Sequence, residues 1–267
     1  MLAALSPARR RLLLTIAGAV AAALVAVVTW KVVDAATASK RAAAPQDQPG
    51  PVLLVPGYGG STSALTQLAG ALRAHGRDAR VVQVPDGGTG DLRTQARALA
   101  TAAEAALADT KQRSVDVVGY SAGGVVARLW AREFAGAGEA RRIVTLGSPQ
   151  HGTDVAALAG SVIGCPVACQ QLVPDSDLLN TLNAKDETPD GPVWVSIWSD
   201  VDQVVVPPDS ARLDGAMNLT VQSICASSRV SHGELPTDKI VTNVVLAELD
   251  AASTTTFASA DCARLSA

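Results

Sequence analysis

One short stretch of the chain carries the residues best suited to covalent chemistry. Residues 119–123 read Gly-Tyr-Ser-Ala-Gly and follow a mostly β-branched run at 115–118. Glycine two residues either side of a serine permits a sharp strand-to-helix turn, where a Cβ would collide with neighbouring backbone. Apolar residues then recur at near-helical spacing through Phe134. We therefore predict that Ser121 is a nucleophile at a strand end; the alternative is an ordinary Gly/Ser turn.

A serine nucleophile needs a general base, and the chain has three histidines. When a serine occupies this kind of turn, the acid and then the histidine follow it along the chain. His232 lies after the last predicted strand and before the final predicted helix, so we assign the base to His232. His151 follows an earlier strand and is expected to fix a loop. His75 is expected to be a polar residue near a helix end.

Two carboxylates compete for the role of the orienting acid, because Asp200 and Asp202 both follow the predicted strand at 193–198. Asp202 opens an Asp-x-x-Val-x-Pro turn, whose apolar residues can bury the carboxylate against the imidazole. We therefore predict Asp202 as the acid and keep Asp200 as the alternative. Asp209 and Asp214 lie farther from the strand end and are expected to be solvated.

A site for acyl transfer also needs hydrogen-bond donors for the developing oxyanion. The amide of Ala122, at the predicted helix start, is the first candidate. The loop at 57–60, Gly-Tyr-Gly-Gly, can turn tightly and direct the Tyr58 amide into the site. A phosphate-binding loop is the alternative, but this loop lacks the Lys-Ser/Thr ending and the spacing of the known phosphate loops.

The elements that must position these residues alternate along the chain. Segments rich in apolar and β-branched residues predict six strands, at 52–55, 79–84, 115–118, 142–146, 193–198 and 219–224. Helices are predicted at about 62–74, 91–108, 125–134 and 237–249, with Ser61 or Thr62 and Asp91 as caps. Because parallel strands need crossovers and these are usually helical, the pattern predicts an α/β fold: a mostly parallel six-stranded sheet with helices on both faces.

Composition limits the number of domains and the classes of partner that we expect. The 267 residues are 48% hydrophobic, which suffices for one large core, and we predict a single domain at 51–267. The net charge of −3 and the pI near 5.6 argue against a nucleic-acid partner, because the predicted domain has no basic stripe. The oligomeric state cannot be predicted from these quantities.

The front of the chain has the composition of a targeting segment. Three arginines at 9–11 precede nineteen uncharged residues, 12–30, and then Lys31. We predict a signal peptide or a signal-anchor transmembrane segment at 1–38 and a linker at 39–50. Ala-Thr-Ala at 36–38 would suit cleavage, whereas the apolar length would suit an anchor. In either case the body is expected to be exported, and either secreted or anchored to the outer face of the cytoplasmic membrane.

Four cysteines, Cys165, Cys169, Cys225 and Cys262, fit an oxidising location because they are even in number and lie in the exported part. Proximity favours pairing the first two and the last two, although the other two connectivities stay open. A zinc site is the alternative. The chain has no Cys-x-x-Cys pair and two histidines have other assignments, so we predict no metal.

Five motifs together carry a resemblance to a known family, at 55–60, 119–124, 196–202, 212–216 and 231–235. In this order they resemble the small lidless bacterial lipases of the lipase A type, the class 2 lipases, over about 51–249. The resemblance implies the α/β-hydrolase fold and hydrolysis of acylglycerols or simple acyl esters without a cofactor. It also implies a triad of Ser121, Asp202 and His232, with Tyr58 and Ala122 as oxyanion donors.

The sequence departs from this family in two places, and it leaves other functions open. The stretch 154–192 is longer than a minimal lidless member needs, and a membrane-anchor-like front is not typical of a freely secreted lipase. An acyltransferase or a thioesterase would use the same triad. A non-catalytic binding protein of the same fold would typically have lost one triad side chain, whereas all three have candidates here.

Overall fold

The computed structural model describes residues 44–162, 165–253 and 255–267, with isolated positions between 8 and 29. Contacts divide the chain into two units, Met1–Ala42 and Ala43–Ala267. The predicted signal peptide or anchor at 1–38 lies outside the described residues, apart from those isolated positions. Within the described part of the chain, no helix combines the length and the apolar character needed to cross a membrane.

A six-stranded parallel sheet forms the centre of the second unit. The strands run in the order β2-β1-β3-β4-β5-β6, and every neighbouring pair is parallel. Their bounds are β1 (Val52–Val55), β2 (Ala79–Val81), β3 (Val115–Tyr120), β4 (Ala140–Leu146), β5 (Val193–Trp198) and β6 (Met217–Thr220). The predicted α/β fold with a parallel six-stranded sheet is confirmed. All carboxyl ends of the strands meet at one edge, where the predicted site residues follow them.

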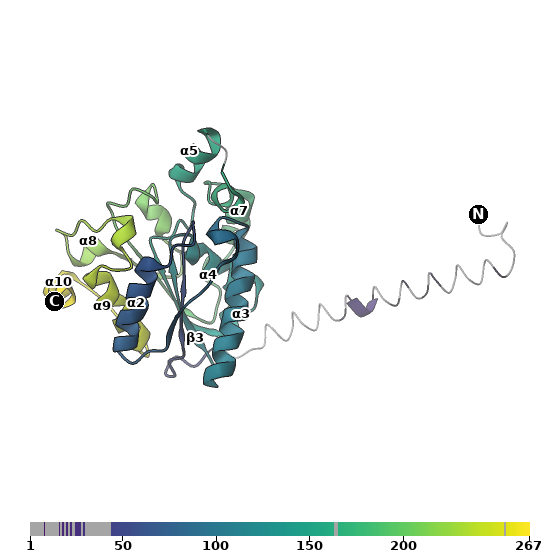
Figure 1. Cartoon of the computed structure of the whole chain (residues 1–267), viewed down its shortest axis with the longest axis horizontal. Coiled ribbons are helices and arrows are strands. Elements are labelled where there is room, and N and C mark those ends of the chain that lie inside the picture. Colours follow the sequence, from purple (N-terminus) through teal and green to yellow (C-terminus); the bar gives the residue numbers. More distant parts are fainter. Residues whose placement is uncertain are drawn as a thin grey trace. The chain divides into compact units, whose positions relative to one another are not determined.

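Helices cover both faces of the sheet, as Figure 1 shows, with α2 and α9 on one side and α3 and α4 on the other. Their bounds are α2 (Ser63–Ala74), α3 (Leu92–Thr110), α4 (Ala122–Glu133) and α9 (Lys239–Asp250). Strand β1 is buried on both faces: Leu53 and Val55 pack towards α3 and α4, whereas Val52 and Leu54 pack towards α2 and α9. This two-sided burial explains its unbroken apolar sequence.

Shorter helices fill the connections at the carboxyl edge and the tail. Between β4 and β5 lie α5 (Asp154–Val162), α6 (Val167–Gln171) and α7 (Asp177–Asn183). After β6 come α8 (Val221–Ile224) and the terminal α10 (Cys262–Ser266). Single 3₁₀ turns are η2 (Pro85–Gly88), η3 (Gly136–Gly138), η4 (Pro208–Ala211), η5 (His232–Glu234) and η6 (Ser259–Asp261). The long stretch 154–192 is therefore largely helical where it is described.

Two predicted strand ends are wrong. The strand expected at 219–224 stops at Thr220, because the Thr220 hydroxyl accepts a hydrogen bond from the Ser223 amide at 3.0 Å and caps α8. The strand expected at 79–84 stops at Val81, and the chain turns away into η2. Asp91 caps α3 as predicted, by accepting from the Thr94 amide at 2.9 Å. Thr62 precedes α2, but its side chain makes no capping hydrogen bond.

Buried ion pairs lie at the amino edge of the sheet. Asp116, near the start of β3, pairs with Arg77 at 2.5 Å and with Arg141 at 2.7 Å. Arg142 pairs with Glu248 of α9 at 2.8 Å, and both side chains are fully buried. Because each buried charge has a partner of opposite sign, this network joins β3, β4 and α9 without leaving a charge unpaired.

Residues 44–50, which the sequence assigns to a linker, contact this edge. The Gln46 side-chain amide donates to the Arg141 carbonyl at 3.1 Å, and Arg141 in turn donates to the Gln46 carbonyl at 3.1 Å. Arg77 donates to the Gly50 carbonyl at 3.1 Å. Residues 44–50 therefore pack against the α/β domain that follows them.

The cysteines form two disulfides, Cys165–Cys169 and Cys225–Cys262, the pairs that proximity favours. The second bridge joins the residue after α8 to the first residue of α10. It thus fixes the tail near the loop that leads to His232.

Candidate active site

Ser121 occupies a strained turn between β3 and α4. Its φ is 54° and its ψ is −127°, which few residues with a side chain adopt. A Cβ on Gly119 would lie 2.6 Å from the Gly124 Cα, and a Cβ on Gly123 would collide with the Val55 carbonyl oxygen. The two glycines therefore allow the turn, which presents Ser121 beyond the carboxyl end of the central strand.

His232 and Asp202 stand in line with this serine. His232 Nε2 lies 3.0 Å from Ser121 Oγ, and His232 Nδ1 lies 2.7 Å from Asp202 Oδ2. With the ring proton assigned to Nδ1, that nitrogen donates to Asp202 and Nε2 accepts from Ser121. The three residues are far apart in sequence and reach this edge on separate loops. Such an arrangement can remove the serine proton and stabilise the imidazolium that results.

Backbone amides hold the Asp202 carboxylate. Oδ1 accepts from the amides of Val204 and Val205 at 2.8 and 2.9 Å, and the side chain is fully buried. Among the ion pairs of the described residues, Asp202 takes part only in the one with His232. Asp200, the alternative acid, is exposed, and its amide donates to Gln222 at 2.9 Å. Of the two predicted candidates, the structure thus brings Asp202 to the imidazole.

Two hydroxyl side chains that the sequence analysis missed support these loops. Thr153 donates to the Val204 carbonyl at 2.7 Å and accepts from the Val206 amide at 3.0 Å, so it holds the turn that presents amides to Asp202. Ser199 donates to the Val230 carbonyl at 2.6 Å and thereby joins the acid loop to the base loop. Single hydroxyls in loops have no periodicity, so no sequence signal could have identified them.

Tyr120, within the Gly-x-Ser-x-Gly stretch itself, contacts the base. Its hydroxyl donates to the His232 carbonyl at 3.2 Å, and the two rings are 5.2 Å apart between centroids. Burial, and then the charge of Asp202, raises the pKa of Tyr120 to about 12. The phenol therefore remains a proton donor at neutral pH and fixes the backbone that carries His232.

Gly147, after β4, packs against the same pair. Its φ is 54°, and a Cβ at this position would lie 3.2 Å from His232 Nδ1 and 3.3 Å from Asp202 Oδ2. Only a residue without a side chain leaves the hydrogen bond between His232 and Asp202 undisturbed here. No motif in the sequence marks Gly147 as a site residue.

Both predicted oxyanion donors lie beside Ser121. Ala122 is the first residue of α4, where a backbone N–H has no acceptor within its own helix. A Cβ on Gly57 would lie 2.8 Å from Ser121 Cβ, so the first loop approaches the nucleophile closely. Tyr58, the next residue, lines the same cavity as Ser121.

The remaining histidines lie outside this cluster. His151 Nε2 is 2.7 Å from Glu187 Oε1, and Nδ1 is 3.3 Å from the Ser210 carbonyl. The hydrogen bond with Glu187 raises the pKa of His151 above its ordinary value, although burial acts in the opposite direction. His151 thus fixes a loop, as expected from the sequence, and His75 follows the last residue of α2.

A buried arginine supports the loop that carries His151. Arg128 of α4 donates to the Asn183 side chain at 2.8 Å and to the Gln150 side chain at 3.3 Å. Burial lowers the pKa of Arg128 to about 10, so the guanidinium stays charged at neutral pH. The cation is satisfied by neutral oxygens of two loops, which it holds together at the carboxyl edge.

Two hollows border the cluster. One has a volume of ≈ 230 Å³, contains Ser121 in its wall and is otherwise mostly apolar; its other lining residues are Tyr58, Pro149, Thr153, Val155, Ala156, Ala159, Cys165, Pro166, Cys169, Leu172, Val204 and Val205. The other, of ≈ 500 Å³, borders His232 and is lined also by Val201, Gln203, Val204, Arg229, Ser231 and Gly233. The first suits a hydrocarbon chain and the second is more polar.

Solved structures of several proteins share this fold. Lipase B of Aspergillus fumigatus superposes with a TM-score of 0.70 at 18% identity, covering 79% of this chain and 55% of that one. The mature form of lipase BlEst2 of Bacillus licheniformis gives 0.56 at 20% identity, covering 65% and 82%. A bromoperoxidase of Bacillus anthracis gives 0.51 at 14% identity, covering 78% and 98%. The chain has the α/β-hydrolase fold, and it spans about half the length of the Aspergillus enzyme.

Sequence comparison identifies the family. No curated protein sequence matches the chain. The family model described as Lipase (class 2) matches residues 94–242, which is more than half of the chain and includes Ser121, Asp202 and His232. The chain therefore belongs to the class 2 lipase family.

Proposed function

We propose that this protein is a serine hydrolase that cleaves carboxylic esters, of acylglycerols or of simple alcohols, through an acyl-enzyme intermediate. The observation that carries the proposal is the hydrogen-bonded line from Ser121 through His232 to Asp202, at 3.0 and 2.7 Å, beside an apolar cavity. Membership of the class 2 lipases supports the same chemistry.

Acylation begins at Ser121. Its Oγ attacks the ester carbonyl carbon while its proton passes to His232 Nε2, which lies 3.0 Å away. The amides of Tyr58 and Ala122 stabilise the negative charge on the former carbonyl oxygen, and Asp202 stabilises the imidazolium. The bond between carbon and the leaving oxygen then breaks, and the alcohol departs with the proton from Nε2.

Deacylation repeats these steps with water as the nucleophile. His232 takes a proton from the water as it attacks the acyl carbon on Ser121, and the same amides stabilise the second oxyanion. The bond to Oγ then breaks, the acid is released and Oγ regains its proton. The protein supplies every group that these steps require, so the proposed reaction uses no cofactor.

Ester hydrolysis by the full chain and by two serine variants tests the proposal. Ser121→Ala should lower the hydrolysis of p-nitrophenyl butyrate by about 10⁴–10⁶-fold, because the nucleophile is lost. Ser63→Ala, an exposed position on α2, is the matched control and should retain wild-type activity. Both variants should melt near the wild-type temperature. Activity of Ser121→Ala within about tenfold of wild type would remove Ser121 from the mechanism.

The more polar hollow beside His232 favours a second candidate function. Its volume of ≈ 500 Å³ leaves room for an acceptor alcohol or thiol where water would otherwise enter. An acyltransferase would then form a new ester from the same acyl-enzyme. Supplying glycerol with the ester substrate distinguishes the two, since transfer yields acylglycerol at the expense of free acid, whereas a hydrolase yields the acid.

We also infer that the protein acts outside the cytoplasm, either secreted or anchored to the outer face of the membrane. Two disulfides support this inference, because such bridges persist in oxidising compartments. Cell fractionation with N-terminal sequencing would test it and would establish whether residues 1–38 are removed.

A further inference from the structure

One wall of the ≈ 230 Å³ cavity is built from α5 and the disulfide Cys165–Cys169. We propose that this wall determines the length of the acyl chain that the enzyme accepts. The inference rests on the proposed ester hydrolysis and adds to it the residues that set the preference among acyl chains of different length.

Helix α5 places small side chains on the cavity. Ala156 and Ala159 both line it, as does Val155 on the same helix face. Alanine leaves the space open that a larger apolar residue would fill. Ala157, between them, is not among the lining residues. The volume available beside Ser121 therefore depends on two positions of one helix.

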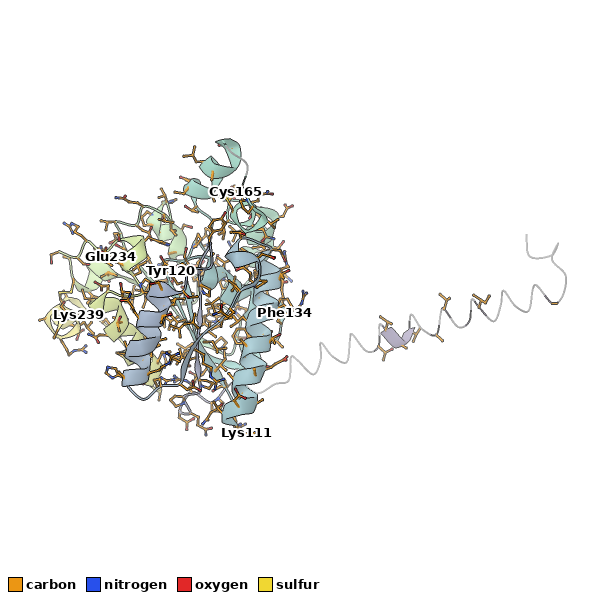
Figure 2. The ribbon with its side chains drawn as sticks, in the orientation of Figure 1. Lys111, Tyr120, Phe134, Cys165, Glu234 and Lys239 are labelled. Carbon is orange, nitrogen blue, oxygen red and sulfur yellow. A yellow bond between two sulfur atoms is a disulfide. The ribbon has the colours of Figure 1, made fainter. Side chains whose placement is uncertain are left out.

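The disulfide lies against this helix. A Cβ on Gly160 would lie 3.6 Å from Cys165 Sγ, and Cys169 Sγ is 3.9 Å from the Ala156 carbonyl oxygen. Both cysteines line the cavity. The bridge thus contacts α5 and lines the cavity beside this helix. Figure 2 labels Cys165 next to α5.

The bridge is also attached to the rigid body. Ala168, beside Cys169 in α6, donates its amide to the Thr89 carbonyl at 3.1 Å. Gln171 donates to the carboxylate of Asp91, which caps α3, at 2.6 Å. By contrast, α5 exposes its large apolar side chains, with Leu158 66% accessible. The disulfide is therefore the part of the wall that is hydrogen-bonded, through α6, to the segment that begins α3.

The size and chemistry of the cavity indicate which chains fit. None of the lining residues carries a charge, so the ligand is apolar. The cavity has a volume of ≈ 230 Å³, so the space beside Ser121 limits how much of an acyl chain can be buried. A longer chain can bury more of its length there only if the wall at α5 and the disulfide moves or is removed.

Removal of each disulfide in turn tests the role of the wall. We expect Cys165→Ala with Cys169→Ala to raise the ratio of kcat/KM for p-nitrophenyl palmitate over butyrate by about tenfold. The matched pair Cys225→Ala with Cys262→Ala also loses one bridge, but those residues do not line the cavity. Its ratio should stay within about twofold of wild type.

A second pair of variants keeps both disulfides and guards against misfolding. Ala159→Leu narrows the cavity and should lower kcat/KM for octanoate about tenfold relative to acetate. Ala157→Leu makes the same change on the same helix, at a position that does not line the cavity, and should leave this ratio unchanged. The acetate rate and the melting temperature report whether each variant is folded.

The outcomes separate this inference from the proposed function. If no ester is hydrolysed in a manner that depends on Ser121, the proposed function itself fails. If hydrolysis depends on Ser121 but the length profiles of both cysteine pairs and both alanine variants equal that of wild type, the proposed role of the wall is overturned while the hydrolase remains.

Discussion

Buried carboxylates near the two ends of β3 have different partners. At its amino end, Asp116 is fully buried between two arginines, Arg77 and Arg141. Its carboxyl end leads to Ser121, about 16 Å away at 3.3 Å per residue, and to the buried carboxylate of Asp202. Asp202 is held by two backbone amides and an imidazole, and no arginine pairs with it among the described residues.

The two sets of partners suit two different roles of a carboxylate, namely joining elements of the fold and stabilising a charge that develops during a reaction. A carboxylate locked between guanidinium groups joins elements of the fold, but its charge is already compensated. A carboxylate held by neutral amides keeps its negative charge available to stabilise an imidazolium that exists only during the reaction. One strand thus joins an edge that stabilises the fold to an edge suited to chemistry, and variants at each edge should separate stability from activity.

The largest effect is expected at the carboxyl edge, on activity alone. Asp202→Asn should lower kcat for ester hydrolysis by about 10⁴-fold, since the amide no longer holds the productive tautomer of His232. Asp200→Asn, two residues away and exposed, is the control and should stay within about threefold of wild type. Steady-state kinetics on p-nitrophenyl butyrate checks both. If Asp200→Asn proves the more sensitive variant, the acid has been assigned to the wrong residue.

The opposite result is expected at the amino edge. Asp116→Ala should reduce the free energy of unfolding by about 3–5 kcal/mol, because Arg77 and Arg141 lose the buried carboxylate that compensates their charge. Asp109→Ala breaks an exposed pair with Arg80 and should cost less than about 1 kcal/mol. Urea denaturation measures both. The folded fraction of Asp116→Ala should retain kcat, and a large loss of kcat at full folding would show that the two edges are coupled.

The smallest effect is expected at a partly exposed pair of the carboxyl edge, His151 and Glu187. The raised pKa of His151 gives stability that is complete below its ordinary value of 6.5 and is lost as pH rises through the folded value. Burial acts most strongly on Glu187 and would raise its pKa, but the hydrogen bonds from His151 and the Asp214 amide and the nearby positive charges together lower it. This lowered pKa gives stability above 4.5 that is lost as pH falls. The pair should therefore stabilise the fold most between about pH 4.5 and 6.5.

His151→Asn measures this contribution. The loss of unfolding free energy should be below about 1 kcal/mol, because the ring is partly exposed, and it should be larger at pH 5.5 than at pH 8.5. Glu187→Gln should cause a smaller pH-dependent loss in the His151→Asn background than in the wild-type chain, because Glu187 then keeps only the Asp214 amide and the charge of Arg128. A deficit that is the same at both pH values would mean that His151 acts by packing and not by charge.

Local patterns predicted the elements whose sequences have one dominant preference. The strands β1 and β5 have the predicted bounds because their apolar runs end at sharp breaks. At 219–224 two preferences competed: three β-branched residues favour a strand, but Thr220 can cap a helix, and in the fold the cap prevails. The helices α5, α6 and α7 were not predicted, because each is short and most of their stability comes from packing.

The sequence by itself determined the strained serine turn, the alternation of strands and helices, and the order of serine, acid and histidine. These features depend on neighbouring residues, whose steric and hydrogen-bonding preferences act within a few positions of the chain. Only the tertiary structure decided that Asp202 and not Asp200 meets His232, that Gly147 has to lack a side chain, and that a disulfide lines the apolar cavity. Those features depend on contacts between loops far apart in sequence, and such contacts exist only once the sheet has brought its carboxyl ends together.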